Sequence, residues 1–149
     1  MSTPSTVAAT GTSRQYGRPC SIASRTTGAR SAAVEHGRPY WREVPVAAIV
    51  DGVLIEGFVD LLVEKPEGLV VVDYKTDQVP AAADLEAALD RYAVQGGAYA
   101  LALETALARP VAGCVFVFTR RAEPLERAVA DLPGAIARAR AALVLTSVH

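Results

Sequence analysis

Hydrophobic residues concentrate in three short runs in the middle of the chain, separated by turn-forming residues. The runs cover residues 41–50, 53–64 and 69–75. Asp51-Gly52 is a strong signal for a two-residue hairpin turn, and residues 65–68 contain the proline and glycine of a second turn. The pattern predicts an antiparallel three-strand meander. Pro45 lies within the first strand, so that strand is expected at a sheet edge.

A helical pattern follows the meander. Between residues 84 and 108, apolar residues recur at steps of three and four and form a single stripe through Leu85, Leu89, Tyr92 and Tyr99. Residues 111–119 are apolar on both faces, which predicts a central strand. Because this strand follows a helix crossover, we expect it to run parallel to a strand of the meander.

A second helix is predicted near the end of the sequence. Asp131, Leu132 and Pro133 form a helix start, and an alanine-rich stretch continues through residues 135–144. Arg138 and Arg140 of this helix are expected to face solvent.

Composition restricts the class of protein. A length of 149 residues allows one domain, and 51% hydrophobic residues suffice for a core. The net charge of −1 does not by itself indicate a nucleic-acid partner. Cys20 and Cys114 have no spacing typical of a zinc site or a disulfide framework. The sequence has no membrane-length apolar run and no signal peptide, so we expect a cytoplasmic protein without a membrane partner.

The first 33 residues differ from the rest. They are rich in Ser, Thr, Arg, Gly and Ala and contain no acidic residue. Such a segment buries too little surface to offset its ordering entropy, so residues 1–35 are predicted to be disordered and residues 36–149 to form the domain. A transit peptide and the replacement of a lost part of a longer ancestral domain are the alternatives.

Charged residues interrupt the apolar strands at Glu43, Asp60, Asp73 and Lys75. With residues 65–68 as a four-residue turn, the register places Asp60 opposite Asp73 on one face. Lys75 follows Asp73 by two and shares that face. The two-residue hairpin turn places Glu43 beside Asp60. Three neighbouring strands are thus predicted to align three carboxylates, with an amine at the end of the row.

Two opposed carboxylates cannot both stay ionised unless a cation lies between them, and a small cluster of hard oxygen ligands suits Mg²⁺ or Mn²⁺. Each residue alone has a simpler interpretation. Asp60 or Asp73 could cap a turn, Lys75 could be solvated, and Glu43 could protect an edge strand from aggregation. The set in register favours a site.

The segment GFVDLL, followed by a turn and VVDYKTD, resembles the RecB-like branch of the PD-(D/E)XK nuclease superfamily over residues 40–119. That branch includes the C-terminal nuclease domains of helicase-nucleases that process DNA ends. The resemblance implies an α/β fold with a restriction-endonuclease-like core, in which a mixed sheet is flanked by helices. It also implies a Mg²⁺-dependent deoxyribonuclease, with DNA as substrate and a helicase subunit or a second copy as possible partner.

Residue roles follow from the resemblance. Asp60, Asp73 and the main-chain carbonyl of Tyr74 would hold Mg²⁺ or Mn²⁺. Lys75 would orient the attacking water or stabilise charge on the phosphate, and Glu43 would be a further ligand or position the water.

The segment Tyr92-x-x-Gln95-x-x-x-Tyr99 is similar to the third motif of the branch, which makes these three residues candidates for substrate binding. A core-facing tyrosine with a satisfied glutamine is the alternative. Gly96-Gly97 inside a helix indicates a close approach by a strand or by a nucleic-acid backbone.

The sequence departs from the family pattern upstream of Tyr40, where a helix usually supplies a metal-binding histidine. No such amphipathic helix is visible, and His36 is interpreted as a linker residue because Gly37 and Pro39 follow it. No four-cysteine iron–sulfur cluster is expected, and no P-loop is present. The alternative function is therefore a catalytically silent module that binds DNA or docks on a helicase.

Overall fold

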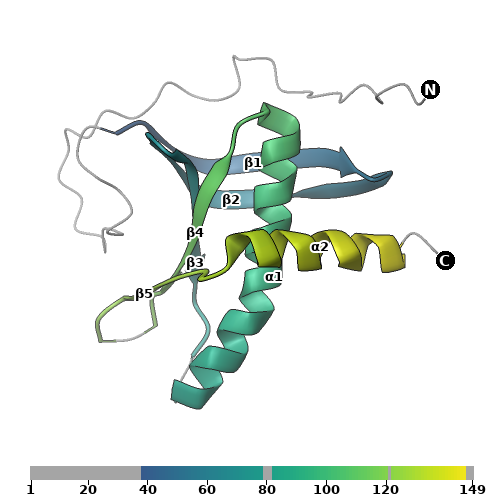
Figure 1. Ribbon diagram of the computed structural model, residues 1–149. Coiled ribbons are helices and arrows are strands. Elements are labelled where there is room, and N and C mark those ends of the chain that lie inside the picture. Colours follow the sequence, from purple (N-terminus) through teal and green to yellow (C-terminus); the bar gives the residue numbers. More distant parts are fainter. Residues whose placement is uncertain (1–37, 79–81, 121, 147–149) are drawn as a thin grey trace, which may run out of the picture.

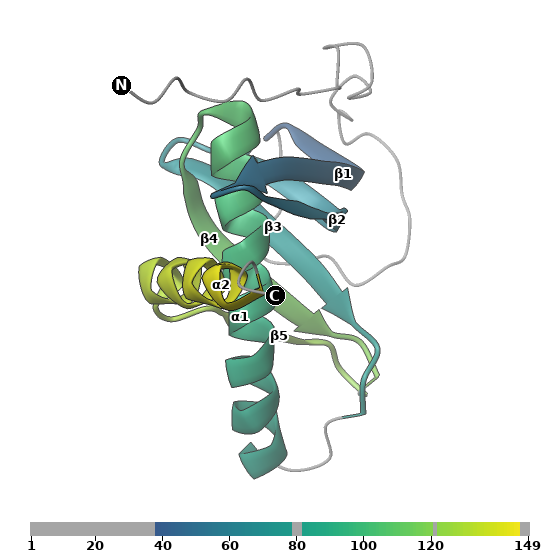
Figure 2. The ribbon, with the colours of Figure 1, turned by 90° about the vertical axis from the view of Figure 1, so that its right-hand side faces the viewer.

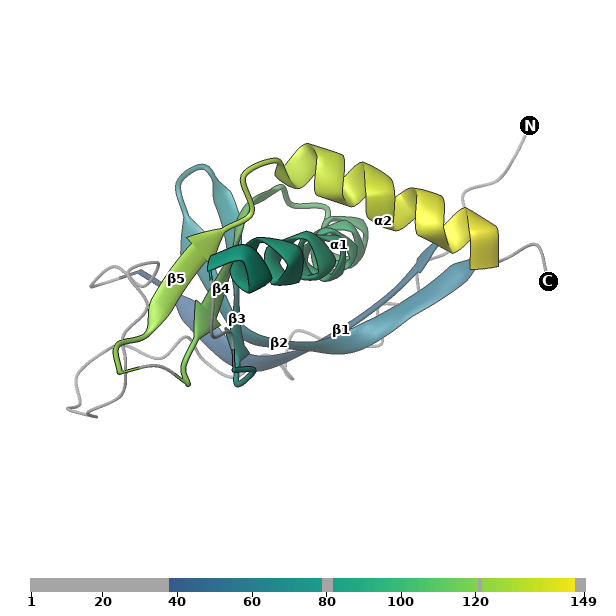
Figure 3. The ribbon, with the colours of Figure 1, turned by 90° about the horizontal axis from the view of Figure 1, so that it is seen from below.

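The computed structural model describes residues 38–78, 82–120 and 122–146 of the chain. This part forms one mixed sheet of five strands in the order β1-β2-β3-β4-β5, with both helices on the same face (Figures 1 and 3). The architecture confirms the predicted α/β class with a meander, a helix crossover and a further strand. In chain order the elements are β1 (Tyr40–Val50), β2 (Val53–Lys65), β3 (Gly68–Lys75), α1 (Ala82–Leu107), β4 (Val111–Phe118), β5 (Leu125–Ala128) and α2 (Leu132–Thr146).

The hairpin of β1 and β2 has the predicted register. Val50 pairs with Val53, and the two turn residues both have positive φ, 51° at Asp51 and 82° at Gly52. Positive φ at both central positions matches the right-handed twist of the flanking strands, which explains why Asp-Gly is favoured here. Strand β1 lies at an edge of the sheet, as Pro45 predicted.

The hairpin of β2 and β3 also has the predicted register, but its turn is shorter than expected. Lys65 and Gly68 pair with each other, so the loop contains two residues and not four. The register is unchanged because one further opposed pair joins the same ladder. The ladder ends at the pair of Leu61 and Val72, three residues before the end of β3.

Strand β4 runs parallel to β3 and lies between β3 and β5, so both predictions for residues 111–119 are confirmed. The four-residue edge strand β5 was not predicted. Its residues are half-buried or exposed and show no clear alternation. Only pairing with β4 makes this segment a strand.

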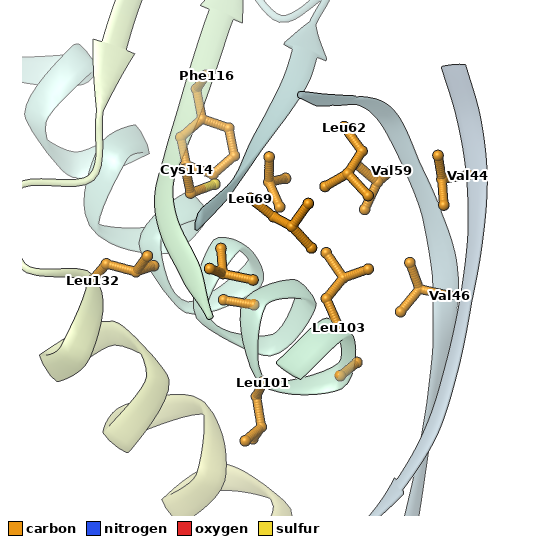
Figure 4. Close-up of a cluster of buried hydrophobic side chains, with 14 of the residues drawn as sticks. Val44, Val46, Val59, Leu62, Leu69, Leu101, Leu103, Cys114, Phe116 and Leu132 are labelled. Carbon is orange, nitrogen blue, oxygen red and sulfur yellow. The ribbon is translucent and has the colours of Figure 1, made fainter. Parts of the chain in front are cut away.

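The core lies between the sheet and α1, as Figure 4 shows for side chains that converge from both layers. Leu103 of α1 is buried among Val46 of β1, Val59 of β2 and Leu69 of β3, all members of one cluster. Helix α2 begins after Asp131, whose carboxylate accepts the N–H of Gly134 at 2.9 Å. It crosses over α1 on the side away from the sheet (Figures 2 and 3). No helix in the described ranges is long and apolar enough to cross a membrane.

At one place in the β1–β2 hairpin, the side chains switch from one face of the sheet to the other. Val44 and Trp41 both pack on the helix-side core although they are three residues apart, and the same holds for Val59 and Leu62 of β2. Alternation along a strand would put such residues on opposite faces. Glu43 and Asp60 lie at this break: they are the opposed pair missing from an otherwise continuous ladder. Glu43 has a φ of 49°, which marks the local distortion.

Candidate active site

The candidate site lies where β2 and β3 separate. Beyond the last ladder pair, β3 continues through Asp73, Tyr74 and Lys75 alongside β4 alone. Asp73 and Lys75 alternate with Leu69 and Val71, so their side chains lie on the face that α1 covers. At this fork, main-chain polar groups of β2 and β3 therefore no longer pair with each other, and helix α1 lies next to them.

Asp60 bridges this fork. Its Oδ2 accepts the main-chain N–H of Tyr74 at 2.7 Å, in place of a ladder hydrogen bond from β2. The N–H and C=O of one strand residue point to the same neighbouring strand, so the carbonyl of Tyr74 faces the same side as Asp60. Two of the predicted ligand groups are thus close together, and the orientation of the Asp60 carboxylate is set by the backbone of β3.

Asp73 is the buried charged residue of the described chain, with 5% of its surface exposed. Burial raises the pKa of its carboxyl, the ion pair with Lys75 lowers it, and the neighbouring Asp60 carboxylate raises it further, with a net upward shift. The influence of Asp60 on Asp73 supports the predicted juxtaposition of the two carboxylates.

Lys75 is nearly buried as well, with 13% of its side chain exposed, so it is not a solvated surface lysine. Its Nζ lies 2.5 Å from Asp73 Oδ2 and donates a hydrogen bond to Gln95 Oε1 at 2.7 Å. Apart from this ion pair, Asp73 Oδ2 has no hydrogen-bond partner among the described residues. One buried carboxylate oxygen thus retains capacity to accept a donor or a cation.

Helix α1 contributes three side chains to the site, one for each of three strands. Tyr99 packs on Gly57 of β2, where an added Cβ would lie 3.0 Å from the Tyr99 ring. Gln95 bridges Tyr99 and Lys75, because its amide donates to the Tyr99 hydroxyl at 3.2 Å. Tyr92 packs against Phe116 of β4, with ring centroids 5.5 Å apart.

The glycine pair of α1 allows this approach. A Cβ at Gly96 would lie 2.7 Å from Cys114 Sγ of β4, and one at Gly97 would lie 2.3 Å from the main-chain oxygen of Ala135 in α2. Each distance is shorter than a Cβ tolerates. Protein elements on two sides of α1 therefore account for both glycines.

Glu43 stands apart from the other candidates. Its side chain is exposed on β1, and its ladder pair with Asp60 is missing from the described hairpin. The charges that act on Asp73 are those of Lys75 and Asp60. The predicted register holds on both sides of Glu43, but the left-handed backbone at this residue breaks its ladder pair with Asp60. His36 lies outside the described residues.

The donor set suits a hard divalent cation. Two carboxylates, those of Asp60 and Asp73, and a main-chain carbonyl on the same side as Asp60 fit Mg²⁺ or Mn²⁺, which keep several waters and need few protein ligands. No cluster of three His, Cys, Asp or Glu side chains occurs in the part of the chain that the structure describes. The protein would thus supply only part of the coordination shell.

Other chemistry is disfavoured at this position. Burial raises the pKa of Cys114 to about 12, so its thiol is not a nucleophile at neutral pH. Sequence reasoning did not single out Phe116, whose ring centroid lies 5.4 Å from Lys75 Nζ. A lone Phe in an apolar strand carries no signal of this contact.

Comparison with known proteins supports the resemblance. The sequence pattern of the PD-(D/E)XK nuclease superfamily matches residues 7–145 of this chain. The match extends well beyond residues 40–119, on which the resemblance was based.

Curated relatives are much longer proteins. An ATP-dependent helicase/nuclease subunit of Desulforudis audaxviator is 43% identical over 82 residues, which cover 49% of this chain and 6% of that protein. The subunit of the same name from Desulfitobacterium hafniense is 35% identical over 100 residues, 63% of this chain and 7% of that protein. The subunit from Acetivibrio thermocellus is 51% identical over 51 residues, 34% of this chain and 4% of that protein. The chain thus spans a small part of these relatives.

Proposed function

The chain belongs to the PD-(D/E)XK nuclease superfamily, and we propose that it is a divalent-metal-dependent deoxyribonuclease that hydrolyses DNA phosphodiester bonds. One observation carries the proposal: the buried carboxylate of Asp73 lies beside Asp60 and Lys75 at the fork of β2 and β3, and its Oδ2 has no partner among the described residues besides the ion pair with Lys75. A buried carboxylate next to a second carboxylate costs free energy, and a bound cation would offset that cost.

Asp60, Asp73 and the carbonyl of Tyr74 would hold Mg²⁺ or Mn²⁺. When bound, such a cation polarises a phosphate oxygen and lowers the pKa of a water molecule. The hydrogen bond from Tyr74 N–H fixes the orientation of the Asp60 carboxylate in advance, so Asp60 would need little reorganisation to bind the cation. Asp73 would bind the cation as a carboxylate and give up part of its interaction with Lys75.

Lys75 would orient the attacking water or stabilise the negative charge that develops on the phosphate. Its ammonium is held by Gln95 on one side and lies at the end of β3, next to both carboxylates. A positive group held beside the metal ligands, in surroundings of low exposure, interacts strongly with a phosphate because water screens it little.

Gln95 and Tyr99 form a chain of hydrogen bonds that ends at Lys75. We propose that they orient this lysine and that the outer part of Tyr99 borders the DNA-binding surface. Glu43 would contribute through the DNA or a water, since its side chain is exposed at the edge strand.

The relatives are named ATP-dependent helicase/nuclease subunits. We propose that this domain acts in DNA end processing, recombination or repair together with a helicase that separates the strands, because the names of its relatives join a helicase and a nuclease. A homo-oligomer is the alternative assembly.

A catalytically silent module is the second candidate function. The ion pair of Lys75 with Asp73 favours it, since that pair occupies part of the proposed metal site. No third metal-ligand side chain joins Asp60 and Asp73 in the described part of the chain. Such a module would bind DNA or a helicase without cleavage.

The deciding experiment incubates the purified chain with labelled single- and double-stranded DNA in the presence of Mg²⁺, Mn²⁺ or chelator. We expect metal-dependent cleavage that is lost in Asp73→Ala. Glu67→Gln is the matched control, because Glu67 is an exposed carboxylate in the turn at the opposite end of β3. Folded wild-type protein with neither cleavage nor a metal-induced rise in melting temperature would support the silent module.

A further inference from the structure

We propose that Tyr92 is a positioning residue for Lys75, not a substrate-binding residue. With Phe116 it forms an aromatic seat, defined as the two ring faces beneath the lysine ammonium. The inference rests on the proposed nuclease function and assigns to Tyr92 a role in orienting the lysine.

The contacts of Tyr92 carry this assignment. Lys75 Nζ lies 4.4 Å from the centre of the Tyr92 ring and 5.4 Å from that of Phe116, both within the range of cation–π attraction. The Tyr92 ring packs in turn against Phe116 and Phe118, with centroids 5.5 and 6.1 Å away. Lys75 and two buried side chains of β4 thus contact the ring of Tyr92, which is itself half-buried, so the ring is engaged mainly by groups of the protein.

The aromatic seat would have a specific role at a metal site. Among the described residues, Lys75 has two polar partners, Asp73 and Gln95, and the Asp73 oxygen that it contacts has no other partner there. A cation held by Asp73 would compete with the lysine for that oxygen and repel the ammonium. The aromatic rings attract the ammonium without binding the metal through oxygen, so they and Gln95 hold Lys75 when Asp73 is engaged elsewhere.

The position of Tyr92 in the helix fits this role. It lies three residues before Gln95, one turn along the same face of α1, and both side chains meet Lys75. Gly96 lets that face approach β4 closely. Helix α1 therefore contacts the Lys75 ammonium through two groups, the amide oxygen of Gln95 and the aromatic face of Tyr92.

The chain offers a sharp spectroscopic test, because Lys65 and Lys75 are its only lysines. Lysine-selective ¹³C labelling gives two ε-CH₂ signals in an NMR spectrum. Ring currents should move the Lys75 signal upfield of the Lys65 signal. The displacement should persist in Tyr92→Phe and shrink in Tyr92→Leu, while the signal of Lys65, the last residue of β2 next to the turn at the other end of β3, stays unchanged as an internal control.

A kinetic comparison tests the functional part. For Tyr92→Leu we expect kcat to fall about tenfold with KM for DNA unchanged, and for Tyr92→Phe both should stay within about twofold of wild type. A rise in KM with kcat unchanged would show that Tyr92 binds substrate and would overturn the proposal. A Lys75 signal insensitive to Tyr92→Leu would also overturn it.

Two safeguards keep the outcomes distinct. If Tyr92→Leu fails to fold, Tyr92→Met provides a side chain of similar reach without a ring. If the wild-type chain cleaves no DNA, the proposed function fails, while the NMR comparison still shows whether Tyr92 holds Lys75.

Discussion

Two ion pairs in this molecule have the same separation and opposite surroundings. Lys75 and Asp73 approach to 2.5 Å with 13% and 8% of their side chains exposed. Arg140 of α2 and Asp51 of the β1–β2 turn also approach to 2.5 Å, with 48% and 49% exposed. Distance alone does not distinguish them, but burial does. Water screens the second pair and offsets its attraction, whereas the first pair lies beside a second carboxylate with little solvent to stabilise it.

The difference between the two pairs shows which part of the fold is unfavourable for folding stability. An exposed pair between a helix and a turn needs no function to explain it. A buried carboxylate of raised pKa, with an oxygen that lacks a hydrogen-bond partner among the described residues, is unfavourable for stability and is typical of a functional site. Three predictions test this contrast.

The largest expected effect is on cleavage by Lys75→Ala. Loss of the ammonium removes the positive group beside the phosphate, so we expect the single-turnover cleavage rate to fall about a thousandfold. Lys65→Ala, which changes the other lysine of the chain, should cleave at the wild-type rate in the same assay. Equal rates for Lys75→Ala and wild type would remove the proposed role of the buried pair.

An intermediate effect is expected on the pH dependence of stability. The folded-state pKa of Asp73 lies above the ordinary value of 3.8 for an aspartate, so folding favours the protonated carboxyl. Its contribution to the free energy of unfolding is full below that ordinary value and is lost as the pH rises through the raised pKa.

Asp73→Asn removes this titration. Its free energy of unfolding relative to wild type should therefore rise with pH across that window. The measurement is denaturant unfolding in chelator at several pH values, with Asp51→Asn as the exposed control. A difference between Asp73→Asn and wild type that stays constant with pH, or falls, would contradict the raised pKa.

The smallest effect is expected for Arg140→Ala. Its pair with Asp51 is half exposed, so its loss should lower the free energy of unfolding by about 0.5 kcal/mol or less. High salt should remove even that difference, because it screens exposed charges. Urea unfolding at low and high salt checks this, and a loss of ~3 kcal/mol would show that burial is not what separates the two pairs.

Much of the fold could be predicted from local patterns. The alternation of apolar residues and the Asp51-Gly52 turn were sufficient for the register of β1 with β2. The helical stripe of α1 and the doubly apolar β4 were sufficient for the crossover. Strand β5 was missed because its pairing partner, not its own sequence, makes it a strand.

The site was predicted in part. Asp60, Asp73 and Lys75 lie together, as the register indicated, and Gln95 meets Lys75. Glu43 is exposed and is not among the charges that act on Asp73: the predicted register continues past it, but its positive φ breaks the ladder pair with Asp60. The glycines of α1 were correctly expected to mark a close approach, and α2 was not foreseen as the second partner.

The sequence by itself determined which residues carry charge within apolar strands, and strand periodicity placed them on shared faces. Those facts depend on neighbours within a hairpin, where backbone pairing restricts the geometry to a few registers. Only the tertiary structure decided the burial of Lys75, the end of the β2–β3 ladder, and the packing of Tyr92 beneath the ammonium. The burial of Lys75 and its cation–π contact with Tyr92 depend on how α1 packs across strands that are distant from it in sequence. No local sequence pattern encodes that packing.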